Sequence, residues 1–154
     1  MIQRIQSVYL FVAIVLTLCL FCFPYVEVLN DEITYTTTTC YLSPSAIGLS
    51  KVVMMPLAIV TCLAVIICFI TLFTFRNRTR QMKLTKISIY LQFLIFATMI
   101  AYIIGLSKAL CADNLQFNLC FPMIFPIVNI ILLVLAHRGI KKDDDLVKSA
   151  DRLR

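Results

Sequence analysis

The most reactive side chains in this sequence are cysteines, and their spacing raises the question of redox chemistry. Cys19 and Cys22 form a Cys-Leu-Phe-Cys motif inside a long apolar run. Thiol redox chemistry needs a thiolate, which an apolar surrounding disfavours, so we interpret these two as packing residues. Cys40, Cys111 and Cys120 lie in the more polar stretches between apolar runs. One disulfide among these three is expected on an oxidising side of a membrane, and its pairing stays open.

Four apolar runs with cysteine-bearing connections are similar to the disulfide-generating quinone reductases of bacterial membranes. Those enzymes carry a Cys-x-x-Cys motif at the periplasmic surface, whereas the first connection here has Cys40 alone. A periplasm-facing thiol–quinone oxidoreductase that uses Cys40, Cys111 and Cys120 is therefore one alternative hypothesis.

Polar side chains inside the apolar runs are few and uncharged. Gln92 and Asn129 are the largest, and Thr17 and Thr61 lie in the other two apolar runs. Side chains of this kind most often form hydrogen bonds between membrane helices, and we expect that use here. Ion-coupled carriers usually place charged groups at mid-membrane, but a small-solute channel or carrier remains a second alternative.

Other reaction motifs are missing from the sequence. The single histidine, His137, has no second histidine with which to build a metal site, and three glycines in the whole chain leave no phosphate-binding loop. We expect no catalytic residues, no cofactor, no metal and no small-molecule substrate, and hence no enzyme.

Composition gives the class of protein. Of 154 residues, 61% are hydrophobic and the mean hydropathy is +0.95, which is too apolar for a water-soluble core of this size. The net charge of +6 does not indicate DNA binding, because most Lys and Arg fall in segments 1–7, 76–86 and 137–154. Short basic segments stay cytoplasmic during membrane insertion.

The pattern predicts an all-α membrane protein with four transmembrane helices at about 8–26, 52–75, 84–106 and 119–136. Both termini are expected in the cytoplasm. The β-branched stretch after the first helix, with Asn30-Asp31 as a turn, predicts a β-hairpin-like first periplasmic loop. Gly105 is expected to end the third helix.

The predicted four-helix bundle ends at about residue 140, and residues 141–154 are expected to form a cytoplasmic amphipathic tail. Its acidic triplet Asp143-Asp144-Asp145 suits a helix N-terminus. Leu146, Val147, Ala150 and Leu153 share one helical face, which predicts a short helix able to dock on a partner.

The two ends of the sequence also carry a resemblance. Residues 1–10 and 142–154 resemble the opening and ending of small four-helix inner-membrane proteins of Bacteroidota, domain-of-unknown-function family 4293. The resemblance implies a bacterial inner-membrane protein with its hairpin in the periplasm, and it implies no catalytic residues.

These observations favour a non-enzymatic accessory subunit of a larger inner-membrane complex, with protein export or insertion machinery as the candidate. Its expected partners are the lipid bilayer, other integral membrane proteins of the complex and a membrane-docked ribosome. The residues expected to bind a partner are Arg76, Arg78, Arg80, Lys83, Lys86, Leu146, Val147, Lys148, Arg152, Leu153 and Arg154.

Overall fold

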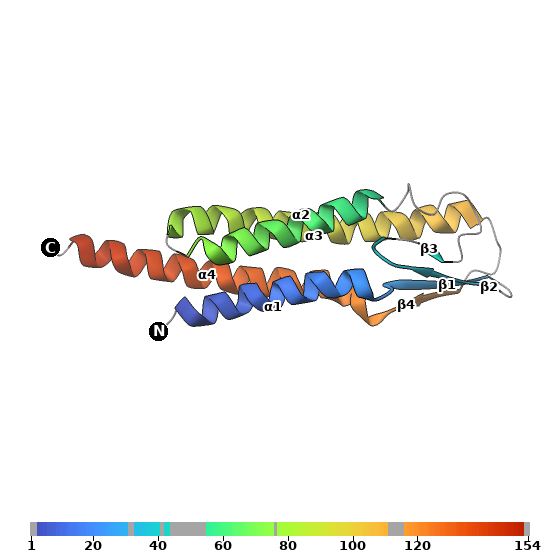
Figure 1. The fold of residues 1–154 in the computed structure, drawn as a ribbon, viewed down its shortest axis with the longest axis horizontal. Coiled ribbons are helices and arrows are strands. Elements are labelled where there is room, and N and C mark those ends of the chain that lie inside the picture. Colours follow the sequence, from blue (N-terminus) through green and yellow to red (C-terminus); the bar gives the residue numbers. More distant parts are fainter. Residues whose placement is uncertain are drawn as a thin grey trace.

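The computed structural model describes residues 3–30, 33–40, 42–43, 55–75, 77–110 and 116–152. Four helices run side by side, and a small antiparallel sheet lies at one end of the bundle (Figure 1). We call that end the sheet end, and the opposite end, where α4 projects beyond its neighbours, the basic end. The helices are α1 (Gln3–Cys22), α2 (Met55–Phe73), α3 (Arg78–Leu110) and α4 (Phe125–Arg152), with the 3-10 helix η1 (Phe121–Ile124) leading into α4.

Each of the four helices is long and apolar enough to cross a membrane, which confirms the predicted number of long apolar helices among the described residues. Large apolar side chains such as Phe11, Phe69 and Tyr90 are more than half exposed. The polar side chains within the helices, such as Thr61 and Gln92, face the interior together with small and some large apolar ones. This arrangement is the one that helices packing inside a bilayer adopt, because lipid covers apolar side chains without cost.

Apart from Ile14, the buried residues of all four helices follow one spacing of alternating three- and four-residue steps. A mean period of 3.5 residues is the pattern of helices that pack along a continuous seam, as in coiled coils and four-helix bundles. In α1 and α2 the seam is Gln6, Leu10, Ala13, Thr17 and Leu20, then Leu57, Thr61, Ala64, Cys68 and Thr71. In α3 it is Gln81, Thr85, Ser88, Gln92, Ile95 and Met99, and in α4 it is Asn129, Leu133, Ala136, Ile140 and Asp143.

Two predicted boundaries in the middle of the chain differ from the structure. α3 begins at Arg78 instead of residue 84. The prediction that the cations between the second and third helices lie in a loop is therefore wrong, because those from Arg78 onward stand on the first turns of α3. Residue 76 lies outside the described residues. α3 also continues through Gly105 to Leu110, because a single glycine costs a helix only about 1 kcal/mol.

The last helix differs as well. It begins at Phe125 rather than at 119, with Pro122 in the 3-10 helix before it and Pro126 in its own first turn, and it runs through residue 141 without a break. The predicted tail is therefore helical up to Arg152, but it is the projecting part of α4 and not a separate short helix. The predicted start of the second helix at 52 lies outside the described residues.

The sheet contains the predicted hairpin and two further strands. β1 (Val26–Asn30) pairs with β2 (Ile33–Thr37), which confirms the hairpin. Asn30, predicted as part of the turn, is instead the last residue of β1, and residues 31–32 lie outside the described part. β3 (Leu42–Ser43) and β4 (Gln116–Leu119) were not predicted, and the strand order is β3-β2-β1-β4. Strand β4 joins the segment before α4 to the segment after α1.

Pro24 sets the end of α1. A residue at this position would normally donate its N–H to the carbonyl of Leu20, but proline has no N–H. The buried hydroxyl of Thr39 donates to the Leu20 carbonyl instead, at 2.5 Å. Thr39, which follows β2, therefore couples this end of the sheet to the first helix. Pro24 explains why α1 stops at Cys22 rather than at 26.

We expect Thr39→Val to lower the free energy of unfolding by about 1–3 kcal/mol, because it leaves a buried carbonyl without a donor. Thr98→Val is the matched control: the Thr98 hydroxyl bonds only to carbonyls of its own helix, which that helix already satisfies. Its expected effect is about 0.5 kcal/mol or less. Denaturant unfolding in detergent micelles measures both, and equal effects would contradict this role of Thr39.

Candidate functional site at the basic end

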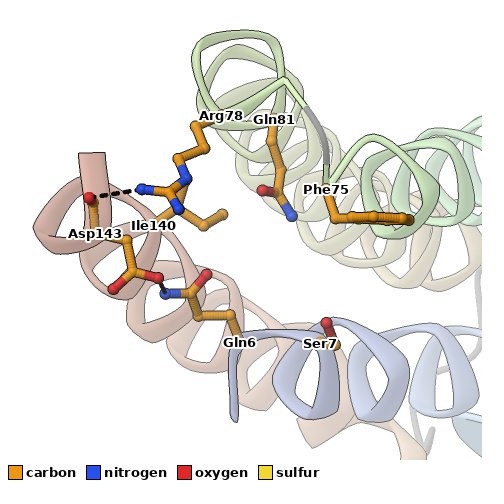
Figure 2. A pocket seen from close by; sticks show the side chains of 7 residues that line it. All are labelled: Gln6, Ser7, Phe75, Arg78, Gln81, Ile140 and Asp143. Atoms are coloured by element: carbon orange, nitrogen blue, oxygen red, sulfur yellow. Dashed lines mark hydrogen bonds between the residues drawn. The ribbon is translucent and has the colours of Figure 1, made fainter. Parts of the chain in front are cut away.

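At the basic end, one aspartate joins three helices. Asp143 is 8% exposed, and its Oδ2 accepts a hydrogen bond from Nε2 of Gln6 in α1 at 2.7 Å. Its backbone carbonyl accepts a second bond from Nη1 of Arg78 in α3 at 2.8 Å. Figure 2 shows the three side chains converging from α1, α3 and α4. Asp143 is thus the last buried residue of the α4 seam among the described residues.

A small cavity of about 20 Å³ lies beside this junction. That space is large enough for one or two water molecules and too small for a metabolite. The side chain of Gln81 points into this cavity (Figure 2). Its Nε2 donates to the carbonyl of Thr71 in α2 at 3.4 Å. The cavity is lined by Gln6, Ser7, Phe75, Arg78, Gln81, Ile140 and Asp143. It serves as part of a helix junction and not as a substrate pocket.

Past Asp143, α4 leaves the bundle and its apolar side chains are exposed. Leu146 is 53% exposed and Val147 is 44% exposed. Val147 stands four residues after Asp143, which is the next step of the seam spacing. The seam of α4 therefore continues past the point where the other described helices end and no longer cover it (Figure 1).

The predicted cations lie around the same end. Arg80, Lys83 and Lys86 are exposed on the first turns of α3, while Arg78 is half-buried against Asp143. Lys86 and Lys141 lie close enough to His137 for their charges to act on its imidazole. For Lys148 and Arg152 the structure describes only helical backbone, and Arg76, Leu153 and Arg154 lie outside the described residues.

Near the middle of the bundle, Thr17 is the centre of a three-helix contact. Its Oγ1 accepts hydrogen bonds from Nε2 of Gln92 at 3.0 Å and from Nδ2 of Asn129 at 3.1 Å, and it donates to the carbonyl of Ala13 at 2.7 Å. A hydroxyl has one donor and two acceptor positions, so the Thr17 hydroxyl is fully used. All three side chains are at most 1% exposed. The expected hydrogen bonding of Gln92 and Asn129 between helices is confirmed.

The cysteines of the alternative hypothesis are only partly within the described residues. Cys40 and Cys120 are free thiols, and Cys111 lies outside the described residues. Partial burial and the nearby charge of Glu27 raise the pKa of the Cys120 thiol. A raised pKa disfavours the thiolate that redox exchange requires.

Metal chemistry receives no support from the described residues, which contain no group of three or more His, Cys, Asp or Glu side chains able to hold an ion. His137 has a buried Nδ1 without a hydrogen-bond partner, but no acidic or sulfur ligand joins it among these residues.

Sequence reasoning missed the role of Asp143 and Gln6. The acidic triplet was interpreted as a helix start, yet Asp143 lies deep within α4. A signal for its role does exist in the sequence: Asn129, Leu133, Ala136, Ile140 and Asp143 continue one spacing, so an acid occupies a buried position.

The fold defines a class, a helical bundle with the length and apolarity of a multi-pass membrane protein and a small antiparallel sheet at one end. Within that class, the chain belongs to the family described as Domain of unknown function (DUF4293), which matches residues 2–153. The predicted family is thereby confirmed. No curated protein matches the chain.

We expect Thr17→Val to destabilise the protein by about 1–3 kcal/mol, because the amides of Gln92 and Asn129 lose their common acceptor. Thr61→Val is the control, since the equally buried Thr61 hydroxyl bonds only to carbonyls of α2. Unfolding in detergent micelles measures both variants. A Thr17 variant as stable as the Thr61 variant would contradict the three-helix contact.

The two glycines in the described helices test the junction between Gln6 and Asp143. Gly105→Ala should stabilise the protein by about 0.5–1 kcal/mol, because a Cβ there meets nothing within 4 Å and alanine favours helix. Gly139→Ala should destabilise it by about 1 kcal/mol, because its Cβ would lie 3.0 Å from Cγ of Gln6 and displace that side chain from Asp143. Melting temperatures that shift in the same direction would refute the Asp143 junction.

Proposed function

We propose that the protein is a non-enzymatic accessory subunit of a larger bacterial inner-membrane complex of the protein-export or insertion class. In this proposal the projecting part of α4 docks on another membrane protein of the complex. The bundle itself anchors that docking element in the bilayer.

The observation that carries the proposal is the uncovered continuation of the α4 seam. Up to Asp143 this seam is buried against α1 and α3, and past it the apolar side chains of Leu146 and Val147 are exposed. An exposed apolar stripe on a helix is the surface that a helical groove or a second helix binds. The Asp143 junction supports the proposal further, because it holds the projection in a fixed direction.

Charge at the same end supports contact with an acidic surface beside the apolar stripe. The exposed cations form no ion pair with another described residue, so their charge is available to anionic lipid or to a partner. They are Arg80, Lys83, Lys86, Arg138, Lys141 and Lys142.

The same cations support the proposed orientation. Lysine and arginine near helix ends favour the cytoplasmic side, so the basic end would lie in the cytoplasm with both termini. The sheet end would then face the periplasm.

The interior supports a structural role over transport. Gln92 and Asn129 both donate to the Thr17 hydroxyl across three helices, and the hydroxyls of Thr61, Thr71 and Thr85 bond to carbonyls of their own helices. Polar groups used in this way hold helices together instead of lining a path.

The test separates the apolar stripe from the charges. Leu146→Asp combined with Val147→Asp should abolish a stoichiometric complex purified in mild detergent, because the docking surface becomes charged. The control is Asp145→Ser, an exposed residue on another side of the same projection, which should leave the complex intact. A truncation for this purpose must begin after Asp143, since removing Asp143 would disturb the bundle itself.

A third variant with Arg80, Lys83 and Lys86 changed to glutamine distinguishes protein docking from simple lipid contact. Protein docking predicts that the complex survives this variant and is lost in the Leu146/Val147 variant. A wild-type chain that purifies as an isolated monomer, or a complex unchanged in both variants, would contradict the proposed function.

A further inference from the structure

A second surface lies at the opposite end of the molecule, where strand β4 forms an edge of the sheet. The order β3-β2-β1-β4 leaves β4 with one paired side, toward β1, and one side that no described residue pairs with. Backbone groups at such an edge are unsatisfied unless a further strand or water meets them.

The register identifies which groups face outward. The N–H of Cys120 donates to the carbonyl of Tyr25 at 3.1 Å, and Asn118 lies opposite Glu27 in the ladder. Since successive residues of a strand send their backbone groups to opposite sides, residues 116, 118 and 120 bond toward β1. The N–H and C=O groups of Phe117 and Leu119 therefore point to the free edge.

The side chains of these two residues share the apolar face of the sheet. They lie opposite Val28 and Val26, which are each 1% exposed against the helices. Phe117 is 36% exposed and Leu119 is 63% exposed. The apolar face of the sheet thus extends past the part of the bundle that covers it.

An apolar groove of about 500 Å³ adjoins this overhang and is formed by the end of β4, η1, the start of α4 and one residue of α3. Its lining is Phe96, Leu119, Cys120, Phe121, Met123, Ile124 and Ile127. Leu119 belongs to both features, so the free edge and the groove form one continuous surface.

We infer that this surface binds an extended segment of a partner polypeptide, which adds as a strand to β4 and places its apolar side chains in the groove. The free N–H and C=O groups of Phe117 and Leu119 can form hydrogen bonds with the backbone of an extended peptide. The groove can bind apolar side chains on one face of that peptide. Lipid acyl chains fit the groove but offer nothing to the edge. The inference concerns a different end of the molecule from the proposed docking of α4 and does not rest on it.

A second copy of this chain does not fit the edge. Copies with the same orientation in a membrane are related by a two-fold axis along the membrane normal. The strands run along the length of the bundle (Figure 1), so this axis would lie parallel to β4. It would place each N–H opposite the same N–H of the other copy, and such a pair forms no hydrogen bond.

The probe is a capped peptide of sequence Thr-Val-Thr-Val-Thr-Val-Thr, added to the full-length protein in lipid nanodiscs. Backbone hydrogen exchange is followed for Phe117, Leu119 and Asn118. We expect rapid exchange at Phe117 and Leu119 without peptide and at least about tenfold slower exchange with it, while Asn118 is protected throughout. A peptide with proline as its central residue should have no effect, because it lacks the pairing N–H.

Variants test the two halves of the surface separately. Leu119→Lys places a charge in the groove, and Leu119→Pro removes an edge N–H that the β1 ladder does not use. Each should weaken peptide binding by about tenfold or more, whereas Asn118→Ser on the opposite face of the sheet should leave it unchanged. Protection of Asn118 in each variant verifies that the sheet has formed.

Four outcomes would overturn the inference. Slow exchange at Phe117 and Leu119 without peptide would mean that the chain itself or lipid covers the edge, and slow exchange only with two copies per disc would mean self-association. Peptide binding that leaves these amides unprotected, or that survives both Leu119 variants, would place the peptide elsewhere.

Discussion

The hydrogen bonds from Gln92 and Asn129 to the Thr17 hydroxyl, at the centre of an apolar bundle, are the interaction on which the rest of this structure depends. In a lipid-like surrounding, apolar side chains do not tell one helix face from another, because lipid and protein solvate them equally well. Polar groups do make that distinction. The Thr17 hydroxyl accepts from Gln92 and Asn129 and thereby fixes the rotation of α1, α3 and α4 about their own axes.

Both ends of the molecule follow from that arrangement. Toward the basic end, the seams that contain Thr17 and Asn129 continue to Gln6 and Asp143, so these two residues meet at the point where α4 leaves the bundle. Toward the sheet end, α1 must stop at Pro24, and the carbonyl that this proline leaves open is bonded by Thr39. The projection of α4 therefore follows from helix packing, whereas the position of the sheet follows from Pro24 and Thr39.

The sequence predicted the features that depend on local composition. Four long helices follow from four apolar runs, and the β1–β2 hairpin follows from β-branched residues around a turn. Helix boundaries were less accurate, because hydropathy does not distinguish a cation in a loop from a cation on the first turn of a helix, as Arg78 shows. Strand β4 could not be predicted, since it pairs with β1 across most of the chain and its own residues, Gln116–Leu119, carry no strong strand pattern.

The candidate site was predicted in composition but not in geometry. The exposed Leu146 and Val147 and the surrounding cations were expected, whereas the junction that orients them was not. Spacing would have revealed it, because polar and small residues recur at alternating steps of three and four in every helix. A search at that period finds Thr17 and Gln92 inside apolar runs, and the same spacing continued past the end of the last run finds Asp143.

The central claim is that the polar side chains of the seam hold a closely packed and dry bundle together. The side-chain amide protons of Gln92 and Asn129 report on this directly when their exchange with water is measured by NMR on the protein in lipid nanodiscs. Our account predicts exchange far slower than that of the exposed Asn118 side chain, because both amides donate to Thr17 away from water. Exchange of Gln92 and Asn129 as fast as that of Asn118 would reveal a water-filled interior and would contradict it.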